Sequence, residues 1–158
     1  MYYRDLSPYE YRPSERGRGI LNVGWLDAEH DFPKGETSDE FRAGLMKLCH
    51  TPVNQTRGFH LSPFADEQQQ RQGCWVRTPG GMRRLGSAEI RVEGPGGKVY
   101  AAPDMVLHYV TDARYLPPPE FVCAVCEWYR KSSGATPKEG KTQARTVLAD
   151  AALRSPHV

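Results

Sequence analysis

The clearest alternation of apolar and polar positions lies just past the middle of the chain. Over residues 88–93 apolar side chains alternate with charged ones, a period of two that places one face of a strand on a core. The glycine- and proline-rich run 94–97 predicts a tight turn, so that 98–102 returns as the second strand of a hairpin. Pro103 and Asp104 favour a helix start directly afterwards, because proline suits the first helical position and a carboxylate suits the positive end of the helix dipole.

Two longer segments have the helical period. In residues 37–50 the apolar side chains recur on one stripe, and Thr37 and Glu40 have the spacing of a capping box. Pro52 predicts the end of this helix, since the residue before a proline disfavours helical geometry. A second helix is predicted over 119–131, where a run of prolines precedes another apolar stripe.

Two short runs, 20–26 and 74–78, are rich in β-branched and aromatic residues and predict further strands. Before the second run the pattern dissolves into a loop, whose polar tract 66–72 is predicted to face solvent. The elements together predict an α+β fold with about three helices packed largely on one side of a small, mainly antiparallel sheet. The strands predicted for this sheet are 20–26, 74–78, 88–93 and 98–102.

Composition divides the chain into one domain and a tail. Residues 1–131 are predicted to form a single domain, which opens with an extended arm over 1–18 whose tyrosine rings pack on the domain. Small and polar residues dominate past position 132, which predicts a flexible tail over 132–158. Within the tail, 144–153 has the pattern of one short helix with a thin apolar face.

The whole-chain numbers narrow the class of protein. A chain of 158 residues with 39% apolar and 25% charged residues can bury an ordinary globular core. The sequence has neither the roughly 20-residue apolar run of a membrane helix nor a signal-peptide pattern, which predicts a soluble cytoplasmic protein with no membrane partner. Its 4 cysteines are accordingly predicted to be reduced thiols. A net charge of +2, evenly scattered, argues against nucleic acid as a partner.

Few residue patterns carry recognisable chemistry. Cys123 and Cys126 have the CxxC spacing of a zinc site, but they fall within an amphipathic helix and no second pair answers them. This context favours two packed thiols. The signatures GxGxxG, GxxxxGK[ST], GxSxG and HExxH do not occur in the sequence. The acidic cluster around His30 is typical of a turn that follows a strand.

Several longer phrases occur in a distinctive order: DLSPYEY at 5–11, NVGWLD at 22–27, LGSAEIRV at 85–92, YAAPDMVLHYV at 100–110 and YLPPPEF at 115–121. In this order they resemble a family of small, soluble, uncharacterised bacterial proteins classed as a domain of unknown function. The resemblance covers residues 1–128 and implies no activity.

The resemblance does imply a His-x-Cys-x-x-Cys segment after the first helix, a spacing suited to tetrahedral zinc. The matching segment here is HLSPFA, beginning at His60, in which Ser62 and Ala65 stand where the thiolates would be. Neither side chain replaces a soft thiolate, so we predict that this chain has lost any such zinc site. Phe59 and Phe64 are then predicted to hold the loop by packing.

For function, the sequence favours a non-enzymatic protein that binds another protein, as an interaction or regulatory domain of the immunity type. No group of residues has catalytic spacing, whereas several side chains suit contacts. No cofactor and no metal is predicted. The candidate binding residues are Trp25, Asp27, His60, His108 and Tyr109.

Two alternatives stay open at this point. The first is a metal-dependent module or small enzyme that uses Cys49, His60 and His108, for which a bound metal or a pocket joining these side chains would be the sign. The second is nucleic-acid binding, which requires a contiguous basic face. The residues available for that face are Arg12, Arg16, Arg18, Arg83 and Arg84.

Overall fold

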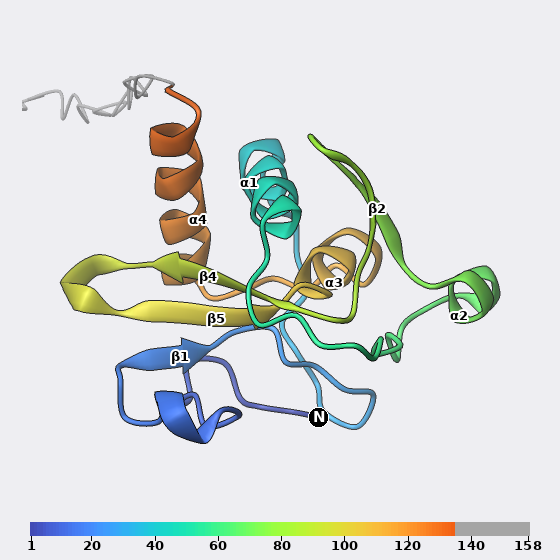
Figure 1. Ribbon diagram of the computed structural model, residues 1–158, viewed down its shortest axis with the longest axis horizontal. Coiled ribbons are helices and arrows are strands. Elements are labelled where there is room, and N and C mark those ends of the chain that lie inside the picture. Colours follow the sequence, from blue (N-terminus) through green and yellow to red (C-terminus); the bar gives the residue numbers. More distant parts are fainter. Residues whose placement is uncertain (135–158) are drawn as a thin grey trace, which may run out of the picture.

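The computed structural model describes residues 1–134, which are organised around a three-stranded sheet in the order β1-β5-β4. Strands β4 (Glu89–Glu93) and β5 (Val99–Pro103) form the antiparallel hairpin that the alternation predicts. Strand β1 (Ile20–Asn22) runs parallel to β5 and is shorter than the predicted strand 20–26. Figure 1 shows this sheet in the middle of the molecule, with helices on one side and the N-terminal segment on the other.

Helices α1 (Asp39–His50) and α4 (Pro119–Ser132) pack against each other beside the sheet, as predicted from their apolar stripes. The Phe41 ring meets the Phe121 ring edge to face, with 6.0 Å between centroids. Gly44 lets the two helices approach closely, because a Cβ at this position would lie 2.8 Å from a methyl group of Val125. The core therefore lies between the sheet and this pair of helices.

Two of the three predicted helix starts need correction. The N-cap of α1 is Ser38, whose Oγ accepts the backbone N–H of Phe41 at 3.1 Å, and not Thr37. The two adjacent hydroxyl residues offer the same capping chemistry, so the sequence does not distinguish them. Pro103 ends β5, and α3 (Val106–Asp112) begins only after Met105.

Strands β2 (Trp75–Thr78) and β3 (Gly81–Arg84) form a separate two-stranded antiparallel sheet. The prediction that 74–78 joins a four-stranded sheet is therefore wrong. The sequence does not predict β3, because Gly-Met-Arg-Arg has no alternation of apolar and polar positions. This hairpin packs on α1: the His50 ring occupies the space that a Cβ on Gly80 would need.

The polar tract predicted to be a loop contains a short helix, α2 (Glu67–Gln72). Asp66 and Gln69 form a capping box, in which each side chain accepts the backbone N–H of the other residue. No residue of α2 is buried, so the helix has no apolar stripe that the sequence could reveal. The predicted exposure of this tract is correct.

The first 18 residues run beside the sheet and are joined to it by a bridge between Pro8 and Leu21. Tyr9 is 1% exposed. Asp5 accepts the backbone N–H of Gly24 at 2.9 Å and the hydroxyl of Tyr115 at 2.7 Å. These bonds tie the N-terminal segment to the core.

The elements together make an α+β fold, as predicted. Within residues 1–134, none of the helices combines the length and apolar character needed to cross a membrane. The helix predicted at 144–153 lies outside the described residues, as does the predicted tail beyond position 134.

Candidate functional site

A pocket of about 300 Å³ opens where four parts of the chain meet. Its walls come from the N-terminal segment with Trp25 and Leu26, from the loop 54–60, from residues 86–89 at the start of β4, and from residues 103–105 with Tyr109. The lining combines aromatic and aliphatic side chains with a small number of polar ones. A pocket of this size suits a small ligand.

Aromatic rings held in fixed orientations form part of the wall. The indole N–H of Trp25 donates to the carbonyl oxygen of Ala101 at 3.0 Å, and the Tyr3 ring meets the indole edge to face at 5.5 Å. Tyr109 is 3% exposed and packs edge to face with Phe64 at 5.5 Å. Because both lining rings are anchored, the pocket keeps its apolar wall without a bound ligand.

Asp104 lines this pocket although the residue is 0% exposed. Its Oδ1 accepts the backbone N–H of Gly86 at 2.8 Å. Its Oδ2 is buried and has no hydrogen-bond partner in the part of the chain that the structure describes. Burial raises the pKa of Asp104 to about 6, against the opposing effects of the charge of Arg83 and of the backbone N–H groups of Gly86, Ala88 and Met105. At neutral pH the pocket wall therefore contains a buried carboxylate, one oxygen of which accepts no hydrogen bond.

Gly86 allows the chain to reach this carboxylate. Its φ is +111°, and a Cβ would lie 2.3 Å from the carbonyl oxygen of His60. The backbone N–H of His60 in turn donates to the Gly86 carbonyl at 2.7 Å. Only glycine permits this close approach of two loops, which places His60 on the pocket wall beside Gly86, whose backbone N–H donates to Asp104.

A second carboxylate in the lining, Glu89, is fully engaged. Its side chain accepts the Tyr9 hydroxyl at 2.7 Å, the Asn54 amide at 2.8 Å and the Arg91 guanidinium at 2.9 Å. Glu89 therefore joins the N-terminal segment, the loop after α1 and the sheet, and it shapes the pocket. The Ser87 hydroxyl, also in the lining, is buried without a partner among residues 1–134.

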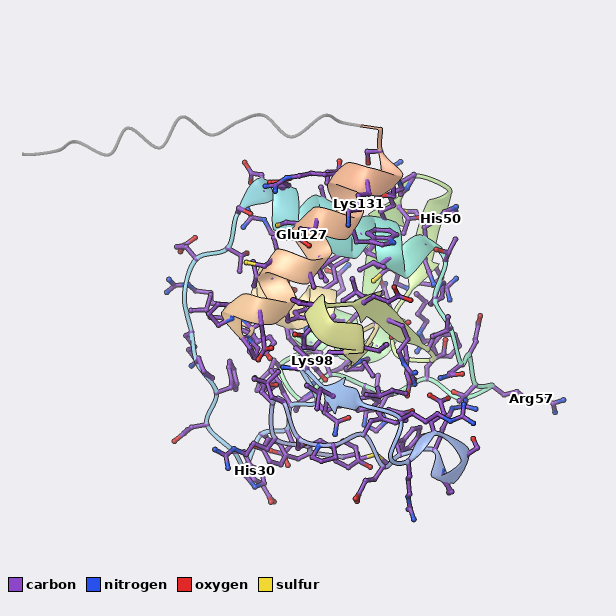
Figure 2. All side chains as sticks on the ribbon, turned by 90° about the vertical axis from the view of Figure 1, so that its left-hand side faces the viewer. His30, His50, Arg57, Lys98, Glu127 and Lys131 are labelled. Carbon is purple, nitrogen blue, oxygen red and sulfur yellow. The ribbon has the colours of Figure 1, made fainter. Side chains whose placement is uncertain are left out.

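The structure brings together Trp25, His60 and Tyr109 from the predicted binding residues, all on the wall of this one pocket. Asp27 does not line the pocket. Its Oδ1 accepts the backbone N–H of His30 and also faces Nδ1 of the His30 ring. These contacts hold the pKa of the Asp27 carboxyl below its usual range. Figure 2 shows His30 at the edge of the molecule. Asp27 stabilises the turn after Leu26.

His108 also lies away from the pocket. Its side chain is buried on α3, and its Nδ1 lies 3.1 Å from Oδ2 of Asp112. Burial lowers the pKa of His108, although the Asp112 carboxylate opposes this effect. The imidazole is therefore neutral at pH 7, and Gln69 of α2 donates to the same carboxylate oxygen.

The metal alternative required Cys49, His60 and His108 to converge, and the structure keeps them apart. Within residues 1–134 no three His, Cys, Asp or Glu side chains are placed to hold a metal ion. The Cys49 thiol is buried against the carbonyl oxygen of Asp104 at 3.6 Å, and burial raises the pKa of this thiol. Such a thiol is neither a ready ligand nor a nucleophile.

The loop that matches the His-x-Cys-x-x-Cys segment is held by packing. Phe64 lies edge to face with Phe32 at 5.2 Å, and Ser62 and Ala65 are buried. Phe59 is 44% exposed, and the Arg84 guanidinium lies over its ring at 4.3 Å from the centroid.

Sequence analysis missed the polar residues that define the pocket. Asp104 has the position expected for a helix start, and Glu89 has the alternation expected of an outward-facing strand residue. Both are buried, because the N-terminal segment and the loop 54–60 cover what a single sheet face would leave in water. No local pattern in the sequence predicts that these two segments cover Asp104 and Glu89.

These features define a small α+β domain with a pocket whose walls are largely apolar and aromatic and include two buried carboxylates. The chain belongs to the family described as Domain of unknown function (DUF7919), whose model matches residues 1–153. The resemblance found in the sequence is thereby confirmed. No curated protein and no solved structure matches the chain.

Proposed function

We propose that this protein is a binding protein of regulatory type and not an enzyme. Its pocket recognises a compact ligand that combines a flat apolar body with a cationic hydrogen-bond donor, such as an amine or amidine. The observation that carries this proposal is the spare oxygen of Asp104, a fully buried carboxylate at the wall of a pocket.

The charge of the ligand follows from the free energy that it costs to bury Oδ2 of Asp104 without a hydrogen bond. A buried polar atom without a partner costs free energy, and an ionised one costs more. A ligand N–H that donates to Oδ2 removes this cost, and a positive charge on the donor strengthens the bond. Glu89 offers no competing acceptor, because its oxygens already accept protein donors.

The apolar body of the ligand follows from the rest of the lining. Trp25 and Tyr109 provide aromatic surface, and Leu26, Pro103 and Met105 provide aliphatic surface. Burying a flat ring against such walls is favourable through the hydrophobic effect and ring packing. A cationic group can also lie over an aromatic face.

Binding is favoured over catalysis because none of the hydroxyl and thiol groups named below is activated as a nucleophile. The Ser87 hydroxyl has no base within hydrogen-bond distance among residues 1–134. Burial raises the pKa of both the Cys49 thiol and the Tyr109 hydroxyl, which keeps these groups protonated. A cytoplasmic location belongs to the same proposal, and the free state of all four cysteines supports it.

The test uses benzamidine as the probe, with benzoate and benzyl alcohol as anionic and neutral analogues of the same ring. Binding is followed by NMR through the indole N–H signal of Trp25, which is assigned with a Trp25→Phe variant. We expect benzamidine to shift this signal at lower concentration than either analogue. Asp104→Asn should weaken benzamidine binding about tenfold or more, because it removes the charge-assisted bond.

Asp39→Asn serves as the matched control, since this carboxylate lies on the exposed first turn of α1 and does not line the pocket. It removes the same charge and should leave binding unchanged. Equal binding of benzoate and benzamidine, or unchanged affinity in Asp104→Asn, would contradict the proposal.

The raised pKa of Asp104 favours one second candidate, a reaction in which this carboxyl acts as general acid or base. Small molecules that copurify with the protein distinguish the two. They are extracted, identified by mass spectrometry and incubated again with fresh protein. Recovery of the unchanged compound supports binding, and conversion that Asp104→Asn abolishes supports catalysis.

A further inference from the structure

The hairpin of β2 and β3 has two unlike faces. Its inner face packs on the body of the protein: Thr78 is buried, Val76 contacts the core, and the Thr78 hydroxyl lies 3.4 Å from Nδ1 of His50. Figure 2 shows His50 at the end of α1, next to this hairpin. The hairpin is therefore held in place from one side.

Its outer face is set by the strand register. Residues directly opposite each other in an antiparallel pair share a face, and Trp75 lies opposite Arg84 while Arg77 lies opposite Met82. The central carbon of the Arg84 guanidinium lies 4.3 Å from the centroid of the Phe59 ring. This contact extends the face onto the neighbouring loop. We call these five residues the outer hairpin face.

This face exposes large apolar side chains. Trp75 is 53% exposed, Met82 is 56% exposed and Phe59 is 44% exposed. Exposed apolar groups that gather in one place mark an interaction site more often than scattered ones do. The Trp75 indole N–H donates to the carbonyl oxygen of Gln72 at 2.8 Å, so the ring is held in place without a partner. A partner would lose little entropy in ordering it.

The face also carries positive charge that the described residues do not neutralise. Neither Arg77 nor Arg84 has a carboxylate within ion-pair distance in residues 1–134, whereas Arg91 and Arg130, on other elements, do. Arg57, on the loop that leads to Phe59, is likewise without an ion pair there, and Figure 2 shows it extending away from the body of the protein. Cationic and apolar groups therefore alternate across one rigid surface.

We propose that the outer hairpin face docks an acidic segment of a partner protein, with apolar side chains of that segment against Trp75 and Met82 and its carboxylates on Arg77 and Arg84. Trp, Met and Arg are the residue types enriched in protein interfaces. Charge complementarity selects the acidic partner. Of the five residues only Phe59 also lines the pocket, so this proposal does not rest on the function proposed for Asp104.

A protein segment fits this face better than single-stranded nucleic acid does. Nucleic-acid sites of that type present several open aromatic faces on which bases stack. Here the Arg84 guanidinium already covers the Phe59 ring, and Met82 offers no stacking surface. Trp75 alone would remain as a stacking ring.

The experiment is selection from a random peptide library displayed on phage, with the full chain as bait. We expect the enriched peptides to be acidic and to contain aliphatic or aromatic residues among the carboxylates. Affinity of a synthetic enriched peptide is then measured by fluorescence anisotropy. It should fall by about tenfold or more in Trp75→Ala and in Arg77→Glu, and it should weaken as salt rises.

The matched control is Arg18→Glu, which reverses another exposed arginine, on the N-terminal segment, and should leave the affinity unchanged. Thermal unfolding of each variant shows that the fold is intact. Peptides without acidic enrichment, equal loss of affinity in the control, or tighter binding of an oligothymidine than of the peptide would each overturn the proposal. So would a dimer in light scattering that Trp75→Ala dissociates, because the occupant would then be a second copy.

Discussion

The Asp104→Asn variant tests the electrostatic description of the pocket without any ligand. Asparagine keeps an oxygen for the Gly86 N–H and removes the buried charge. The variant should therefore change how stability depends on pH, and the size of the change follows from the pKa of this carboxyl.

In the folded protein burial raises that pKa from 3.8 to about 6. Between these values the folded chain binds the proton more tightly than the unfolded chain, so the free energy of unfolding falls as pH rises. The ionised carboxylate destabilises the fold by about 3 kcal/mol, an effect that is fully present above about pH 7 and largely lost below about pH 4. Because the asparagine side chain does not titrate, the free energy of unfolding of the variant should not fall in this way as pH rises.

The assay is urea unfolding of both proteins at a series of pH values. The quantity of interest is the difference between their free energies of unfolding, because the other titrating groups contribute equally to both and cancel. We expect the variant to gain about 3 kcal/mol relative to the unmodified protein between about pH 4 and about pH 7. A constant offset from imperfect packing of the amide would shift this curve without changing its rise.

A difference that is flat across this range would refute the reasoning. It would mean that Asp104 titrates normally in the folded protein and that its Oδ2 is solvated. A rise of the expected size in Asp39→Asn as well would refute it equally, since that carboxylate is fully exposed.

Three further predictions concern packing, the buried network and the thiols. Gly24→Ala should cost at least about 2 kcal/mol in urea unfolding, because φ is +73° and the Cβ would lie 2.7 Å from a Val106 methyl. Gly17→Ala, with φ +73° and open space, should cost about 1 kcal/mol; equal costs would rule out the overlap. Glu89→Gln should cost about 3 kcal/mol, because it breaks a buried ion pair with Arg91, and a neutral result would show that the network is dispensable. A thiol reagent followed by mass spectrometry should modify Cys123 first, since it alone of the four cysteines is exposed; simultaneous labelling of all four in the native protein would contradict the burial.

The pattern of residues along the chain determined the fold class and the larger elements. The alternation over 88–93 with its glycine turn, and the apolar stripes of α1 and α4, have local causes: a strand repeats every two residues and a helix every 3.6. Segments without such a period escaped prediction. The strand β3 is one, and the polar helix α2, held by its capping box, is the other.

The pocket depended on tertiary structure. Trp25, His60 and Tyr109 were recognisable as binding types, but only the fold brings them to one wall, together with Asp104. Asp104 and Glu89 look outward-facing in the sequence and are buried in the structure, because segments far away in the chain cover them. Burial and hydrogen-bond partners are properties of such long-range contacts. The sequence by itself therefore determined most of the elements that form. Tertiary structure alone decided that the Asp104 carboxylate is buried with one oxygen that accepts no hydrogen bond.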